Sequence, residues 1–357
     1  MQTASKVPAS KQQLAVSRQL LRSATYIDLR APIEFARGAL PGAINMPLMT
    51  DAERDQVGTA YVQQGKEAAL ALGHQLVSGE LRRERVSAWI GYVQAHPAAL
   101  LYCARGGLRS ETVQSWLGEA GVTVPRVEGG FKAIRQVCMD TLAQAPAQKP
   151  MLVVGGRTGC GKTSILPQIP GSLDLERIAN HRSSAFGEFA TPQPAQIGFE
   201  NALAVEYLRH DHATVVMEDE SRSIGHVALP LDWYTAMRGA RTMVVECEMI
   251  DRCRRIEEEY VFEPLRLEAD PTALHARLAG AVTRIQKRLG RARHDEIIVL
   301  METSFEHGDH APWIERLLRW YYDPAYDRHL ESKTEQIVWR GSVEEAPAAA
   351  AILSQSN

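Results

Sequence analysis

The stretch GRTGCGKT at residues 156–163 places the strongest restriction on how this 357-residue chain folds. It fits the pattern G-x-x-x-x-G-K-[ST], follows the apolar segment MLVV and precedes a segment of helical character. A glycine-rich turn between a strand and a helix aims backbone N–H groups at one point, where they can cradle a diphosphate. Such a turn belongs to a parallel sheet flanked by helices. The strand-like segments 214–220 and 241–248, separated by helical ones, are typical of that arrangement.

The residues of this phosphate-binding loop (P-loop) predict roles of their own. Lys162 would neutralise phosphate oxygens, and Thr163 carries the hydroxyl with which such loops ligate Mg²⁺. The acidic run 218–220 ends a later strand, where Asp219, or one of the flanking Glu218 and Glu220, would serve as an acidic partner; a solvated strand end fits the same residues. The loop indicates a diphosphate but not ATP, because no base-recognition motif accompanies it. The candidate phosphate-binding residues are Gly156, Arg157, Thr158, Gly159, Cys160, Gly161, Lys162 and Thr163.

A second glycine loop, LLYCARGGLRS at residues 100–110, follows another apolar strand. Cys103 closes that strand just before two glycines and the predicted helix 109–121, with Arg105 and Arg109 nearby. Backbone N–H groups, the helix N-terminus and two arginines make an electropositive site that favours a thiolate nucleophile. A buried, inert cysteine is the other interpretation of the same residue.

Composition limits the class of protein. The net charge is −3, so any contact with nucleic acid must come from local basic patches. The five cysteines have neither CxxC nor metal-type spacing, which predicts a reducing, cytoplasmic location without disulfides and without a metal site. No segment approaches a membrane span of about 18 apolar residues. The Ala/Gln/Pro-rich stretch 141–150 is predicted to be an interdomain linker, and the tail from residue 344 to be frayed.

Two further groups of basic residues are candidates for contacts with anions. The segment 175–187 contains His181 and Arg182, which would contact an anion opposite the P-loop or else solvate a helix end. The predicted helical stretch 277–293 holds the best local candidates for contacts with nucleic-acid phosphates, although such runs often form a solvated face. These candidates are Arg284, Lys287, Arg288 and Arg291.

Three motifs in one order resemble rhodanese domains: YIDLRAPIEFARGALPGAINMPL, CARGGLRS and VPRVEGGFKA. Joined to a C-terminal P-loop, the chain resembles the bacterial tRNA 2-selenouridine synthase family along nearly its whole length, with EDESRSIG and YYDPAY as further family-like stretches. The resemblance implies an α/β protein of two domains. A rhodanese-like domain would span 1–145, and a P-loop NTPase-like parallel-sheet domain with a helical C-terminal extension would span 146–357.

The same resemblance implies a function. The 2-thiouridine at wobble position 34 of tRNA would be geranylated from geranyl diphosphate, and the S-geranyl group replaced by selenium from selenophosphate. It implies no tightly bound cofactor, a role for Mg²⁺ left open, Cys103 carrying selenium in a persulfide-like form, and an enzyme supplying selenophosphate as a further partner. A P-loop kinase with a rhodanese regulatory module, a tRNA sulfurtransferase and a non-catalytic sulfur carrier are the alternatives.

Overall fold

The computed structural model describes residues 12–189, 191–268 and 270–355, which divide into two compact units. The first unit comprises the chain up to Ala143 together with Pro194–Arg209, and the second comprises Gln144–Gln193 with the chain from His210 onward. Helix α10 (Gln196–Arg209) therefore belongs to the first unit, although it lies far along the sequence. Its Asn201 accepts a hydrogen bond from Arg135 at 2.8 Å and donates one to the carbonyl of Ala39 at 3.1 Å.

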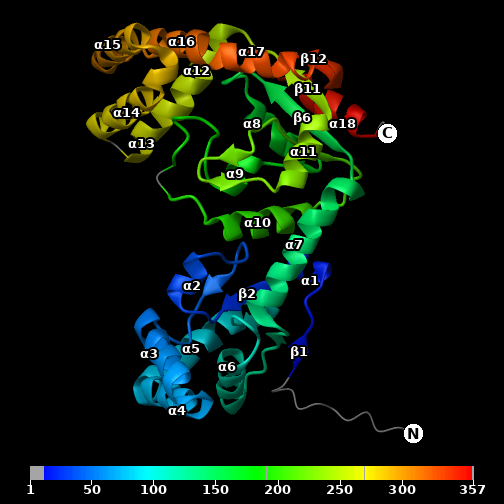
Figure 1. Cartoon of the computed structure of the whole chain (residues 1–357), viewed down its shortest axis with the longest axis vertical. Helices are drawn as coiled ribbons and strands as arrows, with labels where there is room; N and C mark the ends of the chain where they lie inside the picture. Colours follow the sequence, from blue (N-terminus) through cyan, green and yellow to red (C-terminus); the bar gives the residue numbers. More distant parts are fainter. Residues whose placement is uncertain (1–11, 190, 269, 356–357) are drawn as a thin grey trace. The chain divides into compact units, whose positions relative to one another are not determined.

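The first unit is a five-stranded parallel sheet with helices around it (Figure 1). Its strand order is β1 (Gln13–Leu14), β5 (Arg126–Val127), β4 (Ala99–Tyr102), β2 (Thr25–Asp28) and β3 (Ile44–Asn45). All four residues of β4 are buried, as expected for a central parallel strand. The helices of this unit, besides α10, are α1 (Arg18–Ser23), α2 (Pro32–Ala36), α3 (Asp51–Gln64), α4 (Lys66–Leu76), α5 (Gly79–Ala95), α6 (Leu108–Glu119) and α7 (Gly130–Gln148).

The second unit also has a five-stranded parallel sheet, which confirms the predicted α/β class. Its order is β12 (Ile337–Gly341), β11 (Arg241–Val245), β6 (Met151–Gly156), β8 (Val215–Glu218) and β7 (Ser172–Leu173). The central strand β6 is buried throughout and leads into the P-loop, and a short antiparallel pair, β9 (Ser223–Ile224) and β10 (Val227–Ala228), follows β8. Its shorter helices are α8 (Lys162–Ile165), α9 (Leu175–Ala179) and α11 (Leu231–Gly239).

The helical extension of the second unit has a core of its own, in which Leu278, Ile285, Ile297 and Trp313 are buried together. Heptad-like spacing of apolar residues along α14 gives this helix the buried stripe that packs there. The helices that build the extension are α12 (Met249–Glu257), α13 (Glu263–Glu268), α14 (Pro271–Leu289), α15 (Arg291–His307), α16 (Ala311–Leu317) and α17 (Asp323–Glu331). Among the described residues, no helix is long and apolar enough to cross a membrane.

One local prediction was wrong, and two hold only in part. The stretch 141–150 does contain a boundary between the two units, after Ala143, but it is helical, because α7 continues through Gln148 with Pro146 inside it; Ala and Gln favour helix, and Leu142 and Ala145 are buried. The tail is not frayed up to Gln355, since α18 (Ala346–Gln355) packs Ala346 and Ala350 against the core of the second sheet. The basic stretch 277–293 is helical as predicted, but it belongs to two helices, because Gly290, at a φ of +88°, ends α14 and α15 starts at the next residue.

Candidate functional site

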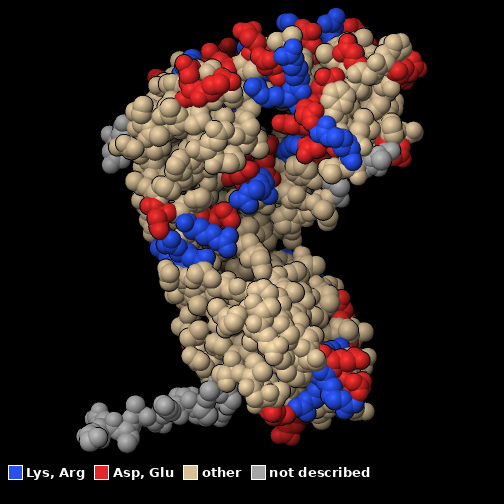
Figure 2. All heavy atoms as spheres, turned by 180° about the vertical axis from the view of Figure 1, so that it is seen from behind, with Lys and Arg blue, Asp and Glu red and all other residues tan. Residues whose placement is uncertain are grey.

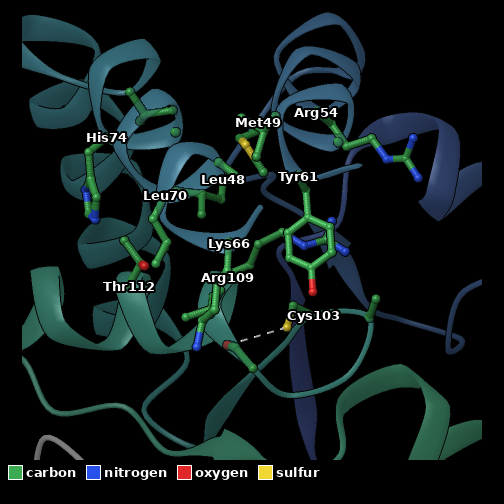
Figure 3. A pocket seen from close by; sticks show the side chains of 18 of the residues that line it. Leu48, Met49, Arg54, Tyr61, Lys66, Leu70, His74, Cys103, Arg109 and Thr112 are labelled. Atoms are coloured by element: carbon green, nitrogen blue, oxygen red, sulfur yellow. Dashed lines mark hydrogen bonds between the residues drawn. The ribbon is translucent and has the colours of Figure 1, made fainter. Parts of the chain in front are cut away.

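The loop after β4 holds Cys103 in a fixed, buried position. Its Sγ lies 3.4 Å from the Ser110 hydroxyl and 3.9 Å from the Gly107 carbonyl oxygen, at the start of α6 (Figure 3). The start of α7 closes the loop from the other side, where the Phe131 N–H donates to the Cys103 carbonyl at 2.8 Å. Gly106 has a φ of +64°, and a Cβ there would lie 2.7 Å from the Gly129 nitrogen, so only glycine fits.

The two arginines of the loop are placed differently. Arg109 lies on α6 and its guanidinium binds Glu34 of α2, with Nη2 and Oε1 3.0 Å apart. Burial alone would raise the pKa of Glu34, but the hydrogen bond and charge of Arg109 outweigh it and leave this pKa below its ordinary value. Arg105, by contrast, has an exposed side chain. Both arginines line the same cavity as the Cys103 thiol.

The rhodanese-like motifs are joined by contacts around a buried arginine. Arg30 pairs with Asp28 and donates to the Gly38 carbonyl at 2.8 Å, and its guanidinium lies 3.7 Å from the centre of the Phe131 ring. Asp28 and Arg30 come from the first motif and Phe131 from the third. The spaced motifs are therefore one structural assembly that supports the Cys103 loop.

A large cavity opens beside Cys103, within the first unit. Its volume is about 1090 Å³, and α3, α4 and α6 form its walls together with the segment around Leu48 and Met49. Figure 3 shows Met49, Tyr61 and Leu70 around the space above the thiol, with Lys66 and Arg109 nearby. No sequence motif indicates this cavity, because the residues that α3 and α4 contribute to it form no recognisable pattern.

The P-loop of the second unit has the expected strand–loop–helix form. Gly159 and Gly161 have positive φ values of +80° and +90°, and α8 begins at Lys162, whose Nζ donates to the Gly156 carbonyl at 2.7 Å. Arg252 donates to the Thr158 carbonyl at 2.8 Å. Because the N–H and C=O of a trans peptide point in opposite directions, the Gly159 N–H faces away from Arg252.

Sequence reasoning missed the groups that support this loop. Arg252 is buried and also binds both carboxylate oxygens of Asp323, at 3.0 and 2.6 Å. Asp323 lies in the YYDPAY stretch, which the sequence marked only as family-like. Arg157 pairs with Asp327 at 2.7 Å, so a second aspartate of α17 holds the loop. A cavity of about 710 Å³ lies beside the loop, and its lining includes Arg157, Arg252, Arg255, Arg319 and Arg340.

The three acidic residues 218–220, at the end of β8, lie in three different environments. Asp219 is buried and bound by Lys333 and by His329, the latter at 2.8 Å; these partners outweigh burial, which alone would raise its pKa, and lower it. Glu218 accepts the Leu175 N–H at 2.8 Å, and burial raises its pKa well above the ordinary value. Glu220 is also buried, and burial together with the charge of Glu176 raises its pKa to about 8.

Glu176 of α9 is the carboxylate that the structure brings to the P-loop. It accepts a hydrogen bond from the Thr163 hydroxyl at 3.3 Å and from the Ser183 N–H at 2.6 Å. Burial raises the pKa of Glu176, against the lowering effect of Ser183 and Lys162. Among the described residues, no group of three or more His, Cys, Asp or Glu side chains is arranged to hold a metal ion.

His181 and Arg182 follow α9 but serve different contacts. Burial lowers the pKa of His181, which forms a β-bridge with Glu188. Arg182 donates to the Glu259 carbonyl at 3.1 Å and lies over the Tyr260 ring, 4.8 Å from its centre. Arg182 is thus engaged by the helical extension rather than directed at the P-loop.

The basic candidates lie at the junction of α14 and α15. Lys287, Arg288 and Arg291 are exposed, whereas the Arg284 guanidinium also donates to the Ala185 carbonyl at 2.9 Å. Figure 2 shows Lys and Arg interspersed with Asp and Glu on the face it presents, without a broad field of one sign. Any contact of this face with nucleic acid must therefore come from a small group of basic side chains.

Comparisons with known proteins place this chain in a family. The family model described as the tRNA 2-selenouridine synthase AAA domain matches residues 149–356. Proteins named tRNA 2-selenouridine synthase from Shewanella oneidensis and Pseudomonas fluorescens are 46% and 48% identical, each over 88% of this chain and 89% and 91% of their own. The relative of that name from Pseudomonas syringae pv. tomato is 46% identical over 90% of this chain. Since the likeness spans both units, and with them the Cys103 loop and the P-loop, this chain belongs to the tRNA 2-selenouridine synthase family.

Proposed function

We propose that this chain replaces the 2-thio sulfur of the wobble uridine of tRNA with selenium, through an S-geranyl intermediate. The observation that carries the proposal is the presence of two distinct loops in one chain, a cysteine loop and a P-loop. A thiocarbonyl sulfur is a poor leaving group, and alkylation converts it into a thiol that can depart. Geranyl diphosphate and selenophosphate are the co-substrates, and the five free cysteines fit a reducing cytoplasm.

The P-loop is assigned to the geranylation step. The diphosphate of geranyl diphosphate accumulates negative charge as the allylic C–O bond breaks, and Lys162 with the loop N–H groups would stabilise that charge. Glu176 and Thr163 supply hard oxygen groups of the kind that Mg²⁺ takes together with phosphates. Arg255, which lines the cavity beside the loop and donates to the Gly159 carbonyl, adds a cationic group for an anionic ligand in this unit.

Cys103 is assigned to the selenation step, as a nucleophile at C2 of the alkylated base. The Sγ–C2 bond forms, the C2–S bond breaks, and geranylthiolate leaves with the electron pair and takes up a proton. Selenium of selenophosphate then bonds to C2 and expels the Cys103 thiolate, and water cleaves the Se–P bond to give phosphate. A perselenide on Cys103 would require two-electron oxidation of selenophosphate selenium, whereas this route needs no oxidant or reductant.

The test is mass spectrometry of wobble nucleosides after incubation with thiolated tRNA, geranyl diphosphate and selenophosphate. We expect selenouridine with all components, and S-geranyl-2-thiouridine when selenophosphate is omitted. With geranylated tRNA and no selenophosphate, a covalent Cys103–tRNA adduct and one equivalent of geranylthiol are expected. Selenium bound to the protein in the absence of tRNA would instead support the carrier role. Phosphate transfer from ATP to a product would support the kinase alternative.

A further inference from the structure

The cavity beside Cys103 is larger and more apolar than a selenophosphate site needs. Its volume of about 1090 Å³ lies just above the range of roughly 300–1,000 Å³ typical of small-molecule sites. Selenophosphate is a small anion, and none of its groups gains free energy from apolar walls. The lining nevertheless includes Leu48, Met49, Val57, Leu70 and Trp116.

Apolar side chains are left in contact with water at this cavity. Tyr61 and Val62 are consecutive residues of α3 that line it, and they are 57% and 84% exposed. Exposed apolar groups gathered around a cavity are typical of a site that an apolar ligand covers. Figure 3 shows Tyr61 reaching over the space near Cys103, with Leu70 of α4 across from it.

We propose that this cavity binds the ten-carbon isoprenoid chain carried on the 2-thio sulfur of the tRNA intermediate. The inference rests on the proposed function and adds the place of the chain during selenation. For Cys103 to reach C2, the sulfur attached to C2 must lie within a few bond lengths of the thiol. A chain bound covalently to that sulfur must then lie in the same cavity, where apolar walls are available.

The polar side chains of the cavity suit the rest of the substrate. Arg54, Lys66 and Arg105 line it as well, and they provide cationic groups for the selenophosphate anion and for tRNA phosphates. One cavity thus offers apolar walls for the leaving group and cations for the incoming one, on either side of the same thiol. This site would select the alkylated nucleoside over the plain 2-thiouridine.

The first experiment compares two anticodon stem-loops, one with S-geranyl-2-thiouridine and one with S-methyl-2-thiouridine, as substrates for selenation. Both have an alkylated sulfur as leaving group, but only one has the chain. We expect the wild type to show a KM at least about tenfold lower for the geranyl substrate, since each buried methylene adds to binding. The double variant Tyr61→Ser/Val62→Ser should bring the ratio of the two KM values close to one.

Ile33→Ser is the matched control, because Ile33 is a 46% exposed apolar residue of the same unit that does not line the cavity. It should keep the wild-type ratio. The replaced residues of the double variant are exposed as well, so folding is not at risk from lost core packing. Equal KM values for both substrates in the wild type, or an unchanged ratio in the double variant, would overturn the inference.

A second experiment needs no turnover. Geraniol, which has the chain but no leaving group, should slow alkylation of Cys103 by iodoacetamide in the wild type, and this protection should be lost in the double variant. Cys247 of the second unit is the internal reference and should react at an unchanged rate. Protection of Cys103 in a protein that produces no selenouridine would support the binding site for the chain but refute the proposed function. Absence of protection would refute the chain site even in an active enzyme.

Discussion

Buried ion pairs determine which residues of the two loops can contact a substrate. Arg109 is held by Glu34 and Asp219 by Lys333 and His329, so both are parts of the support. Cys103 lines an open cavity, and the Lys162 ammonium group donates to a backbone oxygen, the Gly156 carbonyl. A charged group already paired in a buried site is costly to release, which limits it to a positioning role.

Replacing Cys103 by serine should abolish selenium incorporation while the fold and tRNA binding are retained. Serine matches the size of cysteine, but its hydroxyl stays protonated at neutral pH and is a poor nucleophile at C2. Selenouridine is counted by mass spectrometry and tRNA affinity by filter binding. Cys138→Ser, at another buried cysteine of the same unit, is the control and should keep activity. A normal selenouridine yield from Cys103→Ser would refute the assignment.

Glu220 makes a pH-dependent contribution to stability. Its pKa rises from an ordinary 4.5 to about 8 through burial and the charge of Glu176. Between these values the folded protein keeps a proton that the unfolded chain has released, so the free energy of unfolding falls as pH rises. Glu220→Gln imitates the protonated form and should flatten this slope in urea unfolding between about pH 5 and about pH 8. The exposed Glu306→Gln should leave it unchanged, and equal slopes for all three proteins would show the prediction wrong.

At the scale of elements, the end of α14 offers the local basic surface that the overall charge of −3 does not. Lys287 and Arg288 lie in the last turn of α14 and are exposed. Reversing both charges should weaken tRNA binding and reduce the slope of log affinity against log salt by about 1 per lost phosphate contact. Arg284 is left intact because it also holds the Ala185 carbonyl.

The control for this variant is Arg83→Glu on α5, an exposed arginine of the other unit. It should leave both the affinity and the salt slope near the wild-type values. If Lys287→Glu/Arg288→Glu also leaves them unchanged, the end of α14 is a solvated face and tRNA binds elsewhere.

At the scale of the whole molecule, the two loops should fail at different intermediates. Lys162→Ala removes the charge that stabilises the departing diphosphate, so thiolated tRNA should stay unmodified. Cys103→Ala should still geranylate, and S-geranyl tRNA should accumulate. Supplying geranylated tRNA with selenophosphate should therefore restore selenouridine in Lys162→Ala but not in Cys103→Ala. If Lys162→Ala fails on geranylated tRNA as well, the P-loop serves both steps and this division of labour is wrong.

The sequence alone determined the features that depend on local backbone chemistry. Glycines at Gly106, Gly159 and Gly161 permit positive φ values, so each loop and the strand before it could be predicted from neighbouring residues. Apolar runs identified the buried strands β4, β6, β8 and β11 in the same way, but not the two-residue strands or β12. The order of the motifs along the chain indicated the family, and the family implied the expected chemistry.

Only the tertiary structure decided what depends on partners distant in sequence. Asp219 is bound by Lys333 from 114 residues away, and Arg252 by Asp323 from 71 residues away, and no local pattern signals either pairing. The cavity beside Cys103 is likewise built from α3, α4 and α6, whose side chains have ordinary helical roles until folding brings them around one thiol. Conformation at a glycine is set within a few bonds, whereas burial, charge pairing and cavity shape are set by which surfaces fold together.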